Sequence, residues 1–419
     1  MSSKNNVGGN VPKLRFPEFR DAPKWAERQL GDFLSESRIP GSKGDVAKRI
    51  TVKLWGNGVF AKNEATPGSA NTQYFRRKAG QFIYSKLDFL NQAFGIIPAS
   101  LDNYESTVDL PCFNIANGLN TVFLLEYVKR KDFYEKNGET ADGSRKAKRI
   151  QTEPFLSFPV LLPKPEEQHK IAECLSSIDE FITAQTKKRD ALKAHKKGLM
   201  RQLFPAEGET VPKLRFPEFR GAPEWNERKI EEVARRGSGH TPNKKEPSYY
   251  NGGIRWVSLA DSRKLDNGYI STTEIEISKE GLKHSSAVLH PSGTVIVSRD
   301  AGVGKSAILY SAMAVSQHFI AWICDENMLL NWFLYYNLQV LKPNFERAAV
   351  GSTIKTIGLR YFKEMRIVIP SLPEQQKVAD CLSSLDDLIT AQARELESLK
   401  AHKKGLMQQL FPSAVEAQG

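Results

Sequence analysis

The chain repeats two of its own segments, and this duplication limits the folds open to it more than any other feature. Residues 11–28 and 211–228 are identical at 15 of 18 positions. A longer pair, residues 167–205 and 374–412, matches at 26 of 39 positions. Repeats of this kind indicate that one structural unit is built twice. Each half of the chain therefore has a short leading segment, called here the clip motif (residues 11–28 and 211–228), a long middle segment and a tail.

The two middle segments are unlike each other. Residues 29–163 and 229–370 have similar lengths but share little sequence. Two copies of one active site would have to keep the same chemical groups. A fixed frame that carries two dissimilar inserts is instead expected of a protein that presents two different recognition surfaces.

The balance of charge points to an anionic partner. Lys and Arg number 60 against 48 Asp and Glu, which gives a formal net charge of +12. An ordinary solvated basic surface would explain this excess equally well. No apolar run is long enough to cross a membrane, and residues 1–10 lack the apolar core of a signal peptide. The four cysteines lie far apart, which excludes a disulfide framework or a structural zinc site and favours the cytoplasm.

The tails carry the apolar spacing of a coiled coil, with one residue every seven positions and further apolar residues between. This pattern predicts two long helices, over residues 164–205 and 371–412, that pair antiparallel and end before Pro205 and Pro412. Each would be roughly 55 Å long at 1.5 Å per residue. Gln185 and Gln392 lie in the middle of these two apolar stripes. Either they meet and fix the register of the helices or each is half-exposed, and both interpretations stay open. The residues expected to pair the helices are Ile178, Gln185, Leu192, Leu385, Gln392 and Leu399.

The middle segments have the composition of mixed α/β domains. Alternating runs at residues 269–277 and 293–298 predict strands, and the apolar residues 328–341 predict a buried helix. The aromatic residues of the first clip motif (Phe16, Phe19 and Trp25) look like an apolar clip that seats a middle domain on a helix end. The expected fold class is α+β: two globular α/β domains joined by two long antiparallel coiled-coil helices, with pseudo-two-fold symmetry.

The sequence contains no catalytic constellation. Residues 302–306 resemble part of a phosphate-binding loop, but Arg299 stands where that loop needs glycine. The nucleophile elbow, the zinc-protease signature, the dinucleotide fingerprint and the adenine-methylating signature are all missing. The seven histidines form no cluster at the spacing of metal ligands. Catalysis and metal binding are therefore not expected.

Basic and polar residues instead gather on glycine-containing turns, as expected of a surface that contacts phosphates and base edges. For any single residue a solvated charge is the commoner explanation, and Arg299 has the alternative of pairing with Asp300 or another acid to hold its turn. The candidates for DNA contact in the first insert are Arg76, Arg77, Lys78, Lys86, Arg145, Lys146 and Lys148. Those in the second are His240, Thr241, Asn243, Lys244, Lys245, Arg263, Arg299, Lys305, Ser352, Thr353 and Lys355. Gln317 and His318 belong to the same polar set.

Several of these motifs resemble a known family, the specificity (S) subunits of type I restriction–modification systems. In that family an apolar strand, a proline and then Glu-Gln begin each spacer helix, as at residues 158–168 and 367–375. The second insert also has the Gly-His-Thr-Pro of residues 239–242, residues 298–302 and the Gly-Ser-Thr turn at 351–353. The first insert shows residues 84–98, typical of another subtype, and departs most from the pattern.

The resemblance implies a non-catalytic subunit that reads a split, asymmetric DNA target. The implied organisation is a disordered N-terminus (1–10), target-recognition domain 1 (11–163), central spacer helix (164–205), target-recognition domain 2 with linker and clip motif (206–370), C-terminal spacer helix (371–412) and tail (413–419). Two methyltransferase (M) subunits would dock on the helices and carry S-adenosylmethionine, and two restriction (R) subunits would join them. The alternatives are a DNA-modifying enzyme with a diverged site and a coiled-coil assembly scaffold without a nucleic-acid role.

Overall fold

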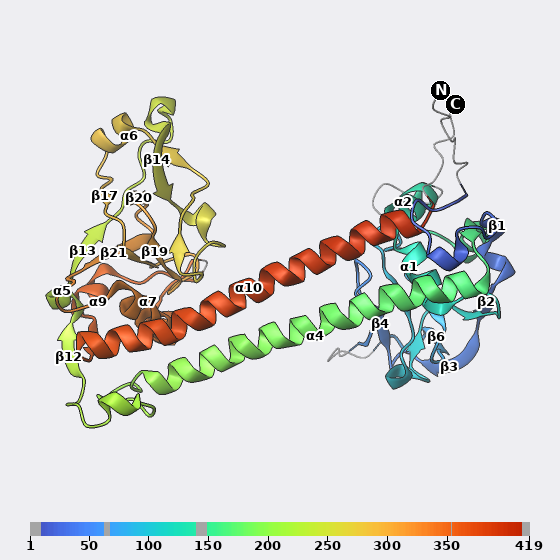
Figure 1. The fold of residues 1–419 in the computed structure, drawn as a ribbon, viewed down its shortest axis with the longest axis horizontal. Coiled ribbons are helices and arrows are strands. Elements are labelled where there is room, and N and C mark those ends of the chain that lie inside the picture. The colour runs from blue at the N-terminus through green and yellow to red at the C-terminus, as the bar shows by residue number, and fades with distance from the viewer. Residues whose placement is uncertain (1–9, 63–67, 140–148, 353, 413–419) are drawn as a thin grey trace. The chain divides into compact units, whose positions relative to one another are not determined.

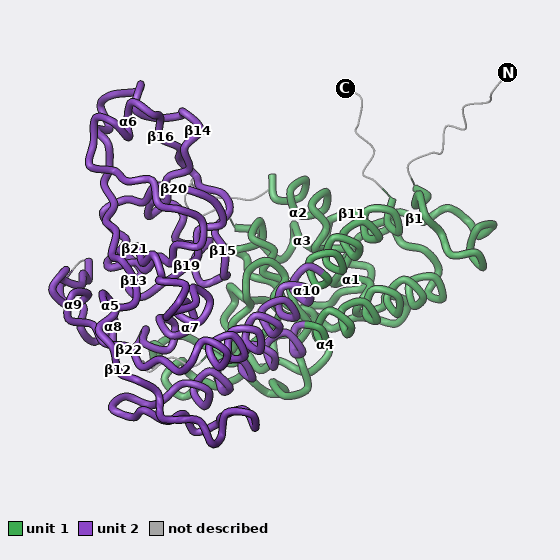
Figure 2. The backbone as a smooth tube through the Cα atoms, turned by 60° about the vertical axis from the view of Figure 1, so that its left-hand side comes forward, with its two compact units in different colours: residues 1–185, 395–419 green, residues 186–394 purple. Residues whose placement is uncertain are grey.

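The chain folds into two compact units, and both long helices contribute to each. The computed structural model describes residues 10–62, 68–139, 149–352 and 354–412. Unit 1 comprises residues 1–185 and 395–419, and unit 2 comprises residues 186–394. Figure 2 colours the two units and shows that the boundary crosses both α4 and α10. Each unit therefore contains a middle domain and one segment from each of the two tails.

The two tails are helices, as the apolar spacing predicts. Helix α4 runs from Pro165 to Leu203 and helix α10 from Leu372 to Leu410, and both are drawn in Figure 1. In unit 1, Asp179 meets Lys403 while Gln185 meets Glu395, so the two helices run antiparallel there. The six expected pairing residues are half-buried, except for Gln392, which is buried in unit 2. A contact between Gln185 and Gln392 stays a prediction.

The domain of unit 1 has a four-stranded sheet in the order β2-β10-β7-β8, a three-stranded sheet β3-β6-β9 and the pairs β4-β5 and β1-β11. The strands are β1 (Ala26–Gln29), β2 (Leu34–Ser37), β3 (Ile39–Lys43), β4 (Ile50–Val52), β5 (Val59–Ala61), β6 (Gln73–Arg76), β7 (Phe82–Tyr84), β8 (Phe94–Ile96), β9 (Glu105–Ser106), β10 (Cys112–Ile115) and β11 (Pro159–Leu162). The helices are α1 (Thr121–Val128), α2 (Lys131–Gly138) and α3 (Thr152–Ser157).

The domain of unit 2 has a five-stranded sheet β13-β21-β18-β19-β15, a four-stranded sheet β16-β14-β20-β17 and the pair β12-β22. The strands are β12 (Asn226–Lys229), β13 (Ala234–Ser238), β14 (Tyr250–Val257), β15 (Tyr269–Ile270), β16 (Glu276–Ile277), β17 (Leu289–His290), β18 (Val295–Ser298), β19 (Ser306–Leu309), β20 (Met313–Val315), β21 (Phe319–Cys324) and β22 (Arg366–Ile369). The helices are α5 (Ile230–Val233), α6 (Lys279–Lys283), α7 (Asn331–Val340), α8 (Lys342–Ala348) and α9 (Leu359–Glu364).

Two of the three local predictions in this domain are confirmed and one is wrong. Residues 293–298 contain strand β18, and residues 328–341 contain the buried helix α7. The single strand expected over residues 269–277 is two short strands, β15 and β16, which belong to different sheets. The alternation was misleading because the chain crosses from one sheet to the other within this run.

In each unit a buried glutamate at the start of the spacer helix holds the clip motif. The Glu167 carboxylate accepts hydrogen bonds from Arg15 Nε (2.8 Å) and Nη2 (2.6 Å) and from the Trp25 indole (3.3 Å). In unit 2, Glu374 binds Arg215 at 2.7 Å through both Nε and Nη2, and the Trp225 indole at 3.2 Å. The clip is thus only partly apolar, because a charged pair supplements the buried tryptophan.

The residue after each glutamate attaches the helix to the middle domain. Gln168 accepts from Asn120 N (2.9 Å) and donates to Gly118 O (3.0 Å). Gln375 accepts from Leu330 N and donates to Met328 O, both at 2.9 Å. The Glu-Gln dipeptide therefore joins the clip motif, the spacer helix and the helix that begins beside it, α1 or α7.

The core of each middle domain is completed by the tail of the other half of the chain. In unit 1, Phe411 packs on Trp25 and Phe123, with ring centroids 6.1 and 5.2 Å apart. In unit 2, Phe204 packs on Trp225 and Phe333 at 6.1 and 5.1 Å. The two halves therefore exchange their C-terminal ends.

A lysine from one helix and an aspartate from the other lie beside each middle domain. In unit 1, Lys403 Nζ binds Asp179 (2.7 Å) and Glu126 of α1 (3.0 Å). Burial alone would raise the Glu126 pKa, but Lys129 and Lys403 more than offset it, so the pKa lies below its usual value. In unit 2, Lys196 binds Asp386 at 2.6 Å, and the Tyr336 hydroxyl of α7 donates to Asp386 at 2.8 Å.

The contacts described above, made by the buried glutamate, the glutamine after it and the Lys–Asp pair of each unit, are called here the joint. Replacing either buried glutamate tests how far each unit depends on its joint. Because Glu167→Gln and Glu374→Gln leave an arginine without its carboxylate, each change should destabilise its own unit by roughly 3 kcal/mol. Denaturant unfolding measures the loss. Exposed Glu173→Gln on the same helix is the matched control and should stay near wild type; equal stability of all three variants would contradict a structural role for the pair.

The exchange of helix ends predicts how a half-chain behaves. A fragment of residues 1–205 lacks residues 399–411, but residues 192–204 match them at 12 of 13 positions. We expect two fragments to exchange these ends and form a dimer, which light scattering coupled to gel filtration detects. Phe204→Ala in the fragment removes the exchanged aromatic ring and should shift it toward monomer. A stably folded monomeric fragment would show that the exchanged end is dispensable.

Candidate nucleic-acid interface

The candidate residues of unit 2 meet at the ends of two paired strands. Strand β18 runs antiparallel to β21, so Ser298 lies opposite Phe319. Arg299 follows β18, and its backbone N–H donates to His318 O at 2.9 Å. The His318 ring lies 2.9 Å from the Asp300 carboxylate. The strand pairing therefore brings two polar turns, far apart in sequence, to one edge of the sheet.

Arg299 and the turn after Gly351 are neighbours, as the sequence suggests. Ile357 N donates to Arg299 O at 2.8 Å, and Arg299 Nε donates to Ile357 O at 3.1 Å. The Asp300 carboxylate pairs with His318, and among the described residues Arg299 forms no ion pair with Asp300 or another acid. The alternative pairing of Arg299 with Asp300 is therefore wrong. Ser352 and Lys355 are exposed, and Thr353 lies outside the described residues.

The turn after strand β13 is attached to the same edge. His240 N donates to Val315 O (3.0 Å), and Thr241 Oγ1 donates to Gln317 Oε1 (2.5 Å). Gly239 has no room for a side chain, because a Cβ would lie 2.2 Å from Ser316 O. The glycine therefore permits a close approach that sets His240 and Thr241 beside residues 317–318. Asn243, Lys244 and Lys245 follow on the turn with exposed side chains.

Lys305 and Arg263 lie at the other end of the Arg299 turn. Ser298 N donates to Lys305 O at 2.8 Å, which closes the turn, and Lys305 Nζ donates to Ser262 O at 3.0 Å. Arg263 is exposed next to that residue. Neighbouring Lys264 is held by Glu274 and Asp261, and the hydrogen bond that Lys264 donates to the Glu274 carboxylate is the main cause of its raised pKa. Contacts thus connect the segments that carry Thr241, Arg299 and Lys305, whereas Arg263, Ser352 and Lys355 are exposed beside them in the chain and their role stays a prediction.

In unit 1 the basic triplet after strand β6 is divided between surface and core. Arg76 is exposed, and Lys78 Nζ donates to Asn103 Oδ1 at 2.8 Å on the surface. Arg77 is 2% exposed, and its guanidinium donates to Ser106 Oγ, Ser37 O, Thr107 O and Leu110 O. Burial, the largest cause, lowers its pKa. The prediction of a DNA contact for Arg77 is wrong, because its donors are used inside the domain.

The other candidates of unit 1 are only partly placed. Lys86 is half-buried, and its carbonyl accepts from Ile150 N at 3.0 Å. Arg145, Lys146 and Lys148 precede that residue in the chain and lie outside the described residues. Arg76, Lys78 and Lys86 therefore do not form a connected set like that of unit 2, and their role stays a prediction.

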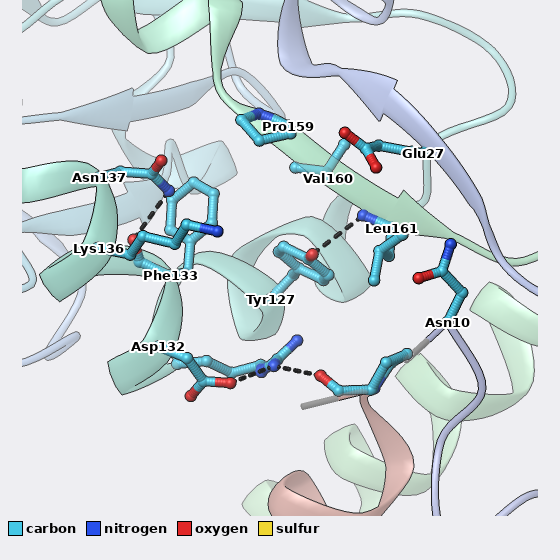
Figure 3. A pocket seen from close by; sticks show the side chains of 12 residues that line it. Asn10, Glu27, Tyr127, Asp132, Phe133, Lys136, Asn137, Pro159, Val160 and Leu161 are labelled. Atoms are coloured by element: carbon cyan, nitrogen blue, oxygen red, sulfur yellow. Dashed lines mark hydrogen bonds and ion pairs between the residues drawn. The ribbon is translucent and has the colours of Figure 1, made fainter. Parts of the chain in front are cut away.

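A small pocket in unit 1 lies between the middle domain, strand β11 and Pro412, which follows α10. Its volume is about 210 Å³, and Figure 3 shows its lining. Tyr127 Oη accepts from Leu161 N at 3.0 Å, and Arg130 donates to Asp132 and to Pro412 O at 2.5 and 2.7 Å. The bond from Arg130 to Pro412 O secures the chain just after α10. Among the described residues no group of three His, Cys, Asp or Glu could hold a metal ion, and none of the described helices could span a membrane.

The sequence did not reveal that four charged residues contribute to the joint. Arg15 and Arg215 lie inside the clip motif, and Asp179 and Asp386 lie at equivalent places on the two helices. The signal that could have found them is the identity of a charged residue at the same position in both copies, with a partner of opposite charge that is also repeated.

Comparison with known proteins decides the family. A model of the type I restriction modification DNA specificity domain matches residues 23–194 and, a second time, residues 223–401. The chain belongs to this family. The resemblance inferred from the sequence motifs is confirmed.

Other members of the specificity family are similar over parts of the chain. The MjaIX specificity subunit of Methanocaldococcus jannaschii is 29% identical over 42% of this chain and 41% of its own length. The putative MjaX specificity subunit of the same organism is 26% identical over 70% of this chain and 67% of its own length. The EcoR124I/EcoR124II specificity subunit of Escherichia coli is 26% identical over 63% of this chain and 64% of its own length. The region that matches the MjaIX subunit thus spans less than half of that subunit's length.

Solved structures share the fold. The S subunit of a type I restriction–modification system from M. genitalium aligns with a TM-score of 0.56 at 16% identity, covering 97% of this chain and all of that chain. A chain from a study of assembly and conformational transition of the type I R-M system aligns with a TM-score of 0.59 at 16% identity, covering 93% of this chain and 96% of that chain. These likenesses support the α+β architecture with two long helices.

The contrast between Arg76 and Arg77 gives a direct test in the first domain of this specificity chain. Arg77→Ala removes four hydrogen bonds of a buried side chain, two of them fully buried, so we expect it to destabilise unit 1 by roughly 2–4 kcal/mol. Arg76→Ala should leave stability within about 0.5 kcal/mol of wild type, because its side chain is exposed. Denaturant unfolding measures both. A stable Arg77→Ala protein with reduced DNA binding would return Arg77 to the candidate contacts.

Arg299 and Lys355 should differ in how their loss affects DNA binding. Removal of an arginine that reads guanine costs about 1–3 kcal/mol of binding free energy and relaxes specificity at one base position. We expect this result for Arg299→Ala. Lys355→Ala should weaken binding to all DNA sequences about equally. It should also reduce the salt slope, the steepness with which log K falls with log salt concentration, by about one. Titration with the expected target and its single-base variants across a salt series, with partner subunits present, measures both effects.

Lys283→Ala in exposed helix α6 is the control for these variants. It should change neither specificity nor the salt slope by a comparable amount. If Arg299→Ala and Lys355→Ala bind like this control, neither residue belongs to the interface.

Proposed function

We propose that the chain is the DNA-reading subunit of a type I restriction–modification complex and acts in the cytoplasm, where its four free thiols suit a reducing environment. Each middle domain would read one half of a split, asymmetric target. The helical spacer would set the gap between the half-sites. Half-sites about one turn of DNA apart lie roughly 34 Å from centre to centre, within reach of a helix of the expected length.

The observation that carries this proposal is that the same joint is present in both units, although the two middle domains differ. The Glu167 and Glu374 clamps match each other contact for contact. The surfaces they support differ, because the polar turns of unit 2 meet around Arg299 while those of unit 1 follow strand β6. A fixed frame with two different readers fits a target whose two halves differ in sequence.

Catalysis in this proposal belongs to partner subunits. Two M subunits would bind S-adenosylmethionine and methylate adenine after rotating the base out of the duplex. Two R subunits would join them in the full complex. This chain would itself hold no cofactor and catalyse no step; its contribution is to place the target adenines where the M subunits can reach them.

Exchange of one recognition domain tests the proposal. Residues 30–158 are replaced by the matching segment of another specificity subunit, which leaves strands β1 and β11 and the Glu167 clamp in place. Because each domain reads independently, one half-site should change while the other half-site and the gap persist. Mapping methylated adenines in cells that carry the complete system reads out the target.

The reciprocal exchange of residues 230–365 is the matched control and should change only the other half-site. A change in both half-sites after one exchange would contradict independent reading.

A further inference from the structure

The main chain on both sides of Thr241 is attached to aromatic residues of unit 2. His240 O accepts a hydrogen bond from the Trp256 indole at 3.0 Å, and Pro242 O accepts one from the Tyr250 hydroxyl at 2.7 Å. Trp256 is buried, and the Tyr250 ring packs edge-on against it with centroids 6.4 Å apart. The position of Thr241 is therefore fixed by contacts that do not involve its own hydroxyl.

Gln317 lies on the turn between strands β20 and β21, where the chain crosses from one sheet of unit 2 to the other (Figure 1). Main-chain bonds hold this turn: Phe319 N donates to Ser316 O at 3.1 Å, and Ser316 N donates to Val257 O at 2.9 Å. The hydrogen bond that Thr241 donates to Gln317 Oε1 joins two side chains at the surface. Since both turns are already fixed without it, this bond orients a side chain and is not required by the fold.

The bond to Thr241 determines which way the Gln317 amide points. A free amide can rotate and exchange the places of its donor and its acceptor, but a hydroxyl that donates to Oε1 keeps the oxygen on the Thr241 side. The oxygen retains a second lone pair. Gln317 is exposed, and its Nε2 forms no hydrogen bond among the described residues. The amide therefore presents one donor group and one acceptor, side by side and in a fixed order, to a ligand outside the domain.

One base edge of duplex DNA matches this pattern. In the major groove adenine presents an acceptor, N7, beside a donor, the N6 amino group, and a glutamine amide can bind both. Guanine presents two acceptors at the same edge, thymine an acceptor and a methyl group, and cytosine a donor. A phosphate oxygen only accepts, so it would leave the oriented Oε1 without a partner. The arrangement of the amide therefore favours adenine over the other bases and over the DNA backbone.

We propose that Gln317 reads an adenine in the half-site of unit 2, donating to N7 and accepting from N6, and that Thr241 is the positioning residue that orients its amide. The inference rests on the proposed function, because it names a base that one recognition domain reads. This adenine is not the one that is methylated, since a base rotated out of the duplex no longer presents its edge in the groove. Lys244 and Lys245, exposed on the turn that follows Thr241, contact phosphates beside this base pair.

Replacement of single atoms in the DNA tests the contact with N7. The chain is assembled with its partner subunits and titrated with a duplex that carries the target mapped by methylation. Each adenine in the half-site of unit 2, on either strand, is replaced in turn by 7-deazaadenine, which lacks the N7 acceptor. We expect one replacement, at an adenine that is not methylated, to weaken wild-type binding about fivefold or more. Gln317→Ala should bind the natural and the replaced duplex equally, because the side chain that contacts N7 is gone.

Two further substitutions test the donor and its orientation. Gln317→Glu keeps the size of the side chain but replaces the donor with a second acceptor. A carboxylate accepts from cytosine N4, so the preference at this one position should shift from adenine toward cytosine. Thr241→Val keeps the shape of the side chain and removes the hydroxyl, and it should reduce the preference for adenine at the same position, whereas Thr241→Ser should retain that preference.

Gln376→Ala is the matched control for these variants. Gln376 is an exposed glutamine of α10 that donates to Asp380 at 2.7 Å, so its replacement also removes one side-chain hydrogen bond at the surface. It should change the preference at no base position. Thermal unfolding of the Gln317 and Thr241 variants should match that of wild type, because the main-chain bonds of both turns remain.

Several results would overturn the inference while the proposed function stands. Equal weakening of every DNA sequence by Gln317→Ala would make the residue a backbone contact, and a large loss of thermal stability would make its bond to Thr241 structural. A half-site of unit 2 without any A·T pair apart from the methylated one would leave no base for Gln317 to read. A wild-type complex that binds all sequences alike would instead overturn the proposed function itself.

Discussion

The fold of each unit depends on one carboxylate. Glu167 and Glu374 stand at the first turn of the spacer helices, where they are nearly excluded from solvent. Each holds a guanidinium with two hydrogen bonds and a tryptophan with a third. A buried charge of this kind is tolerated only when it is fully paired, so clip motif, helix and domain must assemble together. The long helix acquires a fixed direction relative to its own domain through this contact.

The exchange of helix ends makes the two halves dependent on each other. Phe411 and Phe204 complete the core of the domain that belongs to the other half. The lysines beside them find an acceptor in the opposite helix, and each domain adds its own group to that pair: Glu126 in one unit and Tyr336 in the other. The frame therefore has the same geometry in both units while it accepts a different side chain from each domain.

The sequence predicted the parts of the fold that depend on local periodicity. The seven-residue spacing identified both spacer helices, and the prolines marked their ends, because these signals act within a few turns of chain. The apolar clip was only half right, since Arg15 looks like any surface cation until the fold brings Glu167 to it. The run 269–277 failed because alternation does not reveal that a chain changes sheets.

The candidate interface was harder to predict, because a run of charges does not say which side chain faces solvent. Arg76 and Arg77 are neighbours in sequence, yet one is exposed and the other fills a buried polar site. The meeting of Arg299 with residues 350–357 depends on pairing between distant segments.

Among the described residues, the side chains of Gln168 and Gln375 form their hydrogen bonds to the middle domain with backbone atoms. Their amides bind Asn120 N and Gly118 O in one unit, and Leu330 N and Met328 O in the other. Main-chain groups are the same whatever residue carries them, so this contact is indifferent to the side chains of the inserted domain. Recombination within the gene segments that encode the frame would thus deliver a new reader that already fits, and DNA specificity could diversify in single steps instead of residue by residue.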